Sequence, residues 1–152
     1  MRSIPLSLAW LVEHDPAAVV AWRDPATERT GHPVLSRYAE TYWLPVLGPT
    51  SLWALRRLAG WLTEQPGGFP LPLERFAAEL GLGHTRGRHG PHVRALARLV
   101  AFDMARIDGD RLAVRLAVPT MHDRLIARLP AHLAALHDFD AAPEPLSIHR
   151  CA

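Results

Sequence analysis

The sequence predicts a mostly α-helical fold with one small β-hairpin. Apolar residues recur at helical spacing in segments throughout the 152-residue chain. One pair of apolar runs instead flanks an Asp-Gly-Asp turn at 108–110, which is typical of a hairpin. The composition, 49% hydrophobic and 21% charged residues, is that of a globular protein that buries a core without disulfide or metal crosslinks.

Residues 1–49 are expected to form an N-terminal helical extension packed on the core. Asp15 and Pro16 resemble an N-cap and a first-turn proline, so the segment 16–22, "PAAVVAW", is predicted to be a short helix. A turn-rich stretch follows, and 33–43 has helical spacing again. The apolar run at 4–12 is too short to cross a bilayer and precedes no signal-peptide cleavage site, so we expect no membrane association and a cytoplasmic location.

Residues 50–119 contain three predicted helices and the hairpin. Thr50 or Ser51 caps a helix over 52–64, "FPLP" at 69–72 is a short extended edge segment, and Pro72 opens a helix that ends at Gly81. The glycine-rich loop 83–90, "GHTRGRHG", leads into a helix over 91–102. That helix has Val93, Leu96, Ala97 and Val100 on its inner face and Arg94 and Arg98 on its outer face.

The C-terminal part is predicted to be one helix within 120–138, bent at Pro130, and a flexible tail over 139–152. The single cysteine, Cys151, lies in that tail and is interpreted as a bystander thiol. A stripe of apolar residues along the helix either covers its own domain or pairs with a second copy of the chain. We expect the second arrangement, a homodimer. The residues of the stripe are Leu125, Ile126, Leu129, Leu133 and Leu136.

The basic residues are all arginine, which the codon bias of a GC-rich genome explains, but their distribution is uneven. Residues 1–80 have seven arginines against eight acidic residues, whereas 84–128 have nine arginines against four aspartates. Codon bias raises the arginine content everywhere and does not concentrate it in one segment. The asymmetry therefore indicates an anionic partner for 84–128.

The order helix, short strand, helix, loop, helix and hairpin resembles a winged helix-turn-helix domain. The phrases that support the resemblance are "LERFAAELGLG" and "VRALARLVAFDMARIDGDRLAVR", and it covers 50–119. A preceding phrase, "YWLPVLGPTSLWALRRLA", is similar to a segment of small uncharacterised actinobacterial proteins. The resemblance implies a winged helix-turn-helix core with extra N- and C-terminal helices, and a transcriptional regulator that binds double-stranded DNA.

The resemblance also implies which residues contact DNA. Helix 91–102 would enter the major groove, where Arg94 and Arg98 lie on one face and Ala95 between them lets the backbone approach the bases. Gly83, Gly87 and Gly90 allow backbone N–H groups to surround a phosphate. The two carboxylates at the hairpin tip would be repelled by the DNA backbone, so we expect the hairpin to contact DNA only through the arginines on its flanks. The predicted DNA-binding residues are Arg86, Arg88, His92, Arg94, Arg98, Arg106, Arg111 and Arg115.

The sequence is also compatible with functions other than DNA binding. The arginine face and the loop could be solvated surfaces without a partner. The histidines at 84, 89 and 92 have loose spacing and no second ligand pair, so we predict no metal and no cofactor. No P-loop, HExxH or GxSxG motif is present, and we predict that the protein is not an enzyme.

A second functional interpretation is a protein-interaction adaptor in a larger nucleic-acid-handling complex. Its docking surface would be either the hairpin or the tryptophan-rich N-terminal half. For the tryptophans, the alternative is that the rings pack the N-terminal helices onto the core. The tryptophans are Trp10, Trp22, Trp43, Trp53 and Trp61.

Overall fold

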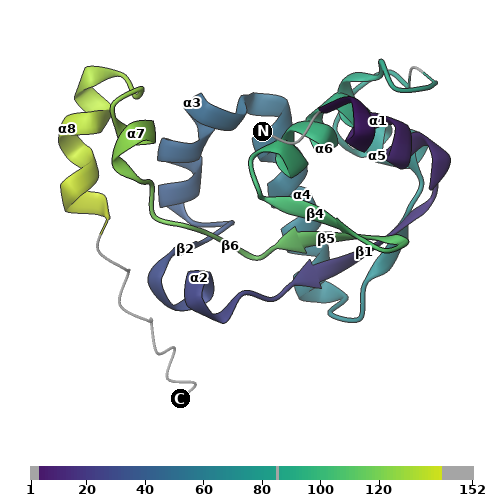
Figure 1. Ribbon diagram of the computed structural model, residues 1–152, viewed down its shortest axis with the longest axis horizontal. Helices are drawn as coiled ribbons and strands as arrows, with labels where there is room; N and C mark the ends of the chain where they lie inside the picture. The colour runs from purple at the N-terminus through teal and green to yellow at the C-terminus, as the bar shows by residue number, and fades with distance from the viewer. Residues whose placement is uncertain (1–3, 85, 142–152) are drawn as a thin grey trace.

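The computed structural model describes residues 4–84 and 86–141, and it corrects the predicted fold class (Figure 1). A four-stranded mixed sheet has the order β3-β1-β5-β4, and helices pack around it. The architecture is therefore α/β and is not mostly α with a small hairpin. The strands are β1 (Ala17–Trp22), β3 (Phe69–Leu71), β4 (Ala105–Asp108) and β5 (Arg111–Arg115).

Strand β1 accounts for most of the difference between the predicted and the observed fold class, because the sequence predicts a helix at 16–22. It lies in the middle of the sheet, antiparallel to β3 and parallel to β5, with Val19 opposite both Phe69 and Leu112. A run of six apolar residues is too short for its periodicity to separate a buried strand from a helix. Its hydrogen-bonding partners lie 50–54 and 93 residues away in the chain, beyond the reach of any local signal.

The other elements of the central region confirm the predictions. The helices are α4 (Pro49–Glu64), α5 (Leu73–Glu79) and α6 (Pro91–Ala101), and the edge segment is β3. Strands β4 and β5 form the antiparallel hairpin, with Gly109 at a φ of 63° in its turn. Side chains from α4, α5, α6 and β5 meet in one core, where Leu55, Leu58, Phe76, Leu96 and Leu112 are fully buried.

The N-terminal helix α1 (Ile4–Glu13) packs against α6, which therefore lies between α1 and α4. Each apolar face of α6 faces a neighbouring element, since α6 also contacts α5 and β4. This packing follows from its sequence, in which apolar or small residues occupy most positions between 93 and 101. It leaves only a narrow part of α6 in contact with solvent.

Shorter elements complete the fold. Helix α2 (Pro25–Thr30) is capped by Asp24, whose carboxylate accepts a hydrogen bond from the Thr27 N–H. Strand β2 (His32–Pro33) pairs antiparallel with β6 (Ala117–Val118), and the π-helical segment η1 (Ala39–Trp43) continues into α3 (Leu44–Leu47). None of the helices in the described ranges has the length and apolar character needed to cross a membrane.

The predicted C-terminal helix is two helices separated at Pro130, namely α7 (Asp123–Ile126) and α8 (Ala131–Asp140). Both lie at the end of the molecule opposite the tip of the β4–β5 hairpin (Figure 1). Of the apolar stripe, Leu129 is buried, Leu136 is exposed and the others are partly buried against the core. Helix α8 extends into the predicted tail, and Cys151 lies outside the described residues.

Candidate nucleic-acid interface

The outer edge of α6 presents two arginines to solvent. Between 91 and 100 the exposed side chains are Pro91, Arg94 and Arg98, so the outward orientation predicted for both arginines is confirmed. The expectation for Ala95 is wrong. That residue is 4% exposed, and its carbonyl oxygen accepts a hydrogen bond from the Ser51 hydroxyl at 3.3 Å. Helix α4 covers the position where a base edge was expected to approach.

A groove of about 420 Å³ separates this edge of α6 from the turn between α3 and α4. The α4 side of the groove is the first turn of a 16-residue helix, and its N-cap residue, Gly48, has no side chain to cap it. The N–H groups of a first helical turn have no intrahelical partner, and that end of the helix is electropositive. The groove is lined by Leu47, Gly48, Pro49, Thr50, Ser51, Pro91, Arg94, Ala95 and Arg98.

The two arginines differ in how firmly they are held. The Arg98 guanidinium donates a hydrogen bond to the Val46 carbonyl oxygen at 2.9 Å and lies 5.1 Å from the centre of the Phe102 ring. The Arg94 side chain makes no hydrogen bond or ion pair with any part of the chain that the structure describes, and its backbone N–H donates a hydrogen bond to the Gly90 carbonyl oxygen. One guanidinium is thus fixed beside the groove and the other is available to a ligand. Together with backbone N–H donors, this set of groups suits an anion such as a phosphate.

The loop before α6 adds two further cations. Arg86 and Arg88 are both exposed, and Gly87 adopts a φ of 84°, in the left-handed region that the glycine content indicated. Gly90 instead has a φ of −62° and is the N-cap residue of α6. The loop also contains Thr85, which lies outside the described residues.

His92 was predicted to contact DNA, but the structure places it in the interior. Its side chain is fully buried and borders a second pocket, of about 340 Å³, together with Asp15, Glu74, His84 and Arg86. Within the described ranges neither of its ring nitrogens has a hydrogen-bond partner. Burial lowers the pKa of His92, and the nearby His84 lowers it further. No DNA contact is therefore proposed for this residue.

The histidine cluster also bears on the metal interpretation. The His84 and His92 rings are 5.3 Å apart between centroids. Among residues 4–84 and 86–141, no group of three or more His, Cys, Asp or Glu side chains is arranged to hold a metal ion. The two rings are thus a neighbouring pair, and no coordination site is assigned to them.

The hairpin arginines lie on a different surface from Arg94 and Arg98. Side chains alternate along β5, so Arg111 and Arg115 point away from the face on which Leu112 and Val114 are buried. Arg106 is opposite Ala113 in the register and shares the outer face. The buried face packs beneath α4 and α6. The predicted DNA-binding residues therefore divide into an α6 group and a separate group on the outer face of the sheet.

Arg115 has a structural role that the sequence did not indicate. Its guanidinium forms an ion pair with Asp24 at 2.7 Å and lies 3.7 Å from the centre of the Trp22 ring, and its side chain is only 12% exposed. The hydrogen bond from Arg115 is the largest of the effects that lower the pKa of Asp24 to about 2. Because 16–22 was expected to be a helix, no pairing of Trp22 or Asp24 with β5 could be foreseen.

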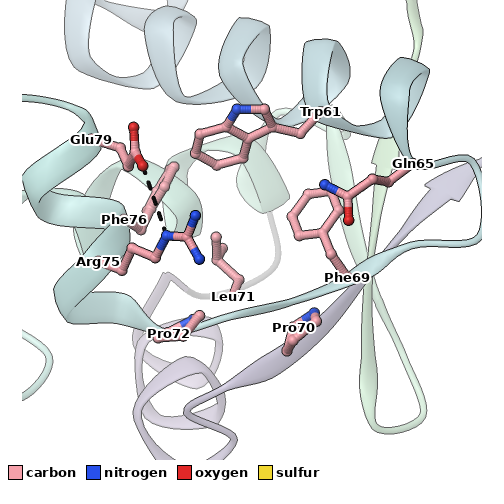
Figure 2. A pocket seen from close by; sticks show the side chains of 9 residues that line it. All are labelled: Trp61, Gln65, Phe69, Pro70, Leu71, Pro72, Arg75, Phe76 and Glu79. Carbon is pink, nitrogen blue, oxygen red and sulfur yellow. Dashed lines mark ion pairs between the residues drawn. The ribbon is translucent and has the colours of Figure 1, made fainter.

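The tryptophans have several environments. Trp43 is buried, Trp10, Trp22 and Trp61 are partly buried, and Trp53 is 57% exposed near the exposed Leu35. Trp61 borders a pocket of about 200 Å³ that no sequence motif indicated (Figure 2). Four of the five rings are therefore at least partly buried, but Trp22, Trp43 and Trp61 contact residues between 69 and 119 and do not simply join the N-terminal helices to the core. Trp53 remains exposed.

Comparisons with models of protein families, with curated proteins and with solved structures find no significant match to this chain.

Proposed function

We propose that the protein binds double-stranded DNA through the exposed edge of α6, and that it acts as a bacterial transcriptional regulator. The observation that supports this most directly is the pair Arg94 and Arg98, which stand beside a groove bordered by the uncapped first turn of α4. The exposed Arg86 and Arg88 of the preceding loop, which belong to the same arginine-rich segment 84–128, add to this support. Both features favour an anionic polymer over a neutral partner.

In the proposed complex a backbone phosphate occupies the groove. Arg98, held by the Val46 carbonyl, supplies a guanidinium at a fixed position, which reduces the ordering cost of binding. Arg94 has no competing partner within the described part of the chain and can extend to a guanine edge in the major groove. Arg86 and Arg88 contact neighbouring phosphates. Because α1 and α4 cover most of α6, base reading is limited to Arg94.

Fluorescence anisotropy with a labelled duplex tests the proposal. Affinity should fall steeply as sodium chloride rises from about 50 to 200 mM, because each phosphate contact releases counterions. Arg94→Ala should weaken binding by about 1–3 kcal/mol and reduce sequence preference. Arg86→Ala and Arg88→Ala should weaken binding to all duplexes alike and reduce the salt slope by about one unit each.

Arg124→Ala is the matched control. Arg124 is an exposed arginine on α7, which lies away from α6 (Figure 1), so this variant loses the same charge at a different place. If Arg124→Ala and Arg94→Ala reduce affinity equally, the binding is a response to net charge and the α6 interface is refuted. Absence of salt-sensitive binding by the unaltered protein at low salt would refute DNA binding as a whole.

A specific observation also favours the adaptor interpretation as a second candidate. Trp53 and Leu35 are exposed by 57% and 51%, respectively, and both border one shallow pocket with Arg56 and Arg57. Exposed aromatic rings beside arginines are typical of the residues that dominate protein interfaces. A partner captured after nuclease treatment, lost with Trp53→Ala and kept with Arg94→Ala, would favour this function over DNA binding.

A further inference from the structure

The pocket between the end of α4, strand β3 and helix α5 has aromatic walls and a charged opening. Trp61, Phe69 and Phe76 provide three rings, and Leu71 closes the inner side. The Phe69 and Phe76 rings stand at 83° and 71° to Trp61, with centroids 5.9 and 6.3 Å away. Figure 2 shows these side chains directed toward a common space. Three rings from separate elements thus converge there.

The polar groups of the pocket are few and lie at its opening. The Arg75 guanidinium extends toward the space between Trp61 and Leu71 (Figure 2). Its partner is Glu79, one turn later on α5, with 3.7 Å between Nε and Oε1 and side chains that are 78% and 40% exposed. Exposed pairs of this kind are weak, so Glu79 holds Arg75 only loosely. A ligand carboxylate can take its place with better bidentate geometry.

The volume of the pocket limits the size of the ligand. Pockets for drug-sized molecules usually enclose about 300–1,000 Å³, and this one encloses about 200 Å³. A cavity of about 150 Å³ is enough for benzene. The space therefore fits a single aromatic ring with one small substituent.

We propose that this pocket binds a small aromatic carboxylate. The ring of the ligand packs against the partly exposed Trp61 and Phe69 rings in the edge-to-face or offset geometry that aromatic pairs prefer, while the fully buried Phe76 ring supports Trp61. Its carboxylate pairs with Arg75. The inference is independent of DNA binding, because the pocket shares no residue with the groove beside α6.

Benzoate and benzamide are suitable probes, since they have the same shape and differ in charge. In an NMR titration, the Trp61 indole N–H signal, assigned with Trp61→Phe, should shift on addition of benzoate with a Kd of about 1 mM. Benzamide should bind about tenfold more weakly because it lacks the charge-assisted pairing with Arg75. No shift of the Trp61 signal with benzoate, or shifts of all five tryptophan signals alike, would overturn the proposal.

Two variants of exposed residues test the carboxylate contact. Arg75→Gln should lower benzoate affinity about tenfold and leave benzamide affinity unchanged. Glu79→Gln should raise benzoate affinity about twofold by removing the competing carboxylate. An unchanged ratio of benzoate to benzamide affinity in Arg75→Gln would overturn the assignment of Arg75.

Two further measurements distinguish this pocket from the α6 groove and from a peptide-docking site. Arg94→Ala, which alters only the α6 groove, should leave the benzoate titration unchanged, so that failure of the DNA proposal and failure of this one are distinguishable. A proline-rich peptide that shifts the Trp61 signal while benzoate does not would overturn the proposal and show that the pocket docks a peptide instead.

Discussion

Gly68 provides a sharp test of the sheet arrangement, because β1 lies directly against it. Its φ is 91°, which L side chains rarely adopt, and a Cβ atom at this position would lie 2.4 Å from the Val19 carbonyl oxygen and 3.1 Å from Val20 Cγ1. Gly68→Ala therefore combines a left-handed backbone with a collision against the central strand. The neighbouring Gly67 has open space around its Cα, and its φ lies outside the positive region.

The backbone strain and the collision together set the expected loss of stability in Gly68→Ala. A left-handed backbone at a residue with a Cβ costs about 1–2 kcal/mol, and the strand displacement needed to relieve the contact costs about 1–3 kcal/mol. Gly68→Ala should lower the free energy of unfolding by about 2–5 kcal/mol, which for a chain of this length lowers Tm by about 5–15 °C. Gly67→Ala should be neutral or stabilising by up to about 1 kcal/mol, because alanine restricts the unfolded chain.

The assay is urea denaturation followed by circular dichroism, with thermal unfolding as a second measurement. Both variants replace glycine by alanine at adjacent positions, so composition and loop length are matched. If Gly68→Ala unfolds within about 0.5 kcal/mol of the unaltered protein, then β1 does not lie over Gly68. The sheet order β3-β1-β5-β4 would then be wrong, and the helix that local sequence predicts at 16–22 would regain support.

Three other perturbations have clear expected results. Arg115→Gln should make the protein unfold at higher pH in an acid titration. The pKa of Asp24 is lowered from 3.8 to about 2, so its carboxylate stabilises the fold above pH 3.8, and this contribution is lost as the pH falls from 3.8 to about 2. An unchanged acid midpoint would contradict the ion pair. His92→Leu should make the free energy of unfolding less dependent on pH: because the pKa of His92 is lowered in the folded state, the unfolded state takes up the proton first, and stability present above pH 6.5 is lost as the pH falls below it. His132→Gln, at an exposed position, should keep the original pH profile. Equal effects of the two variants would exclude burial of His92 as the cause. Leu96→Ala should lower the free energy of unfolding by about 2–5 kcal/mol, since Leu96 is fully buried. Arg94→Ala should change the free energy of unfolding by no more than about 0.5 kcal/mol. If Arg94→Ala is instead unfolded in a urea titration, this arginine is structural.

The local sequence was sufficient to predict the helices and strands that are specified by their own residues. The periodic apolar positions of α4, α5 and α6 predict three helices, the Asp-Gly turn predicts the hairpin, and Pro70 restricts β3 to an edge. The outward orientation of Arg94 and Arg98 follows from the same periodicity, since positions four residues apart share one helix face. These features depend on contacts within one segment or between adjacent ones.

Only the tertiary structure decided the features that depend on distant partners. The segment "AAVVAW" is a strand because β3 and β5 hydrogen-bond to its two edges, and a short apolar run is compatible with either structure until such partners are known. His92 is interior because α1 packs on α6, and Arg115 is structural because β1 brings Trp22 and Asp24 beside β5. The Trp61 pocket is likewise formed by three elements. In each case the decisive energy comes from burial and pairing between segments that are remote in sequence, which periodicity and capping signals do not encode.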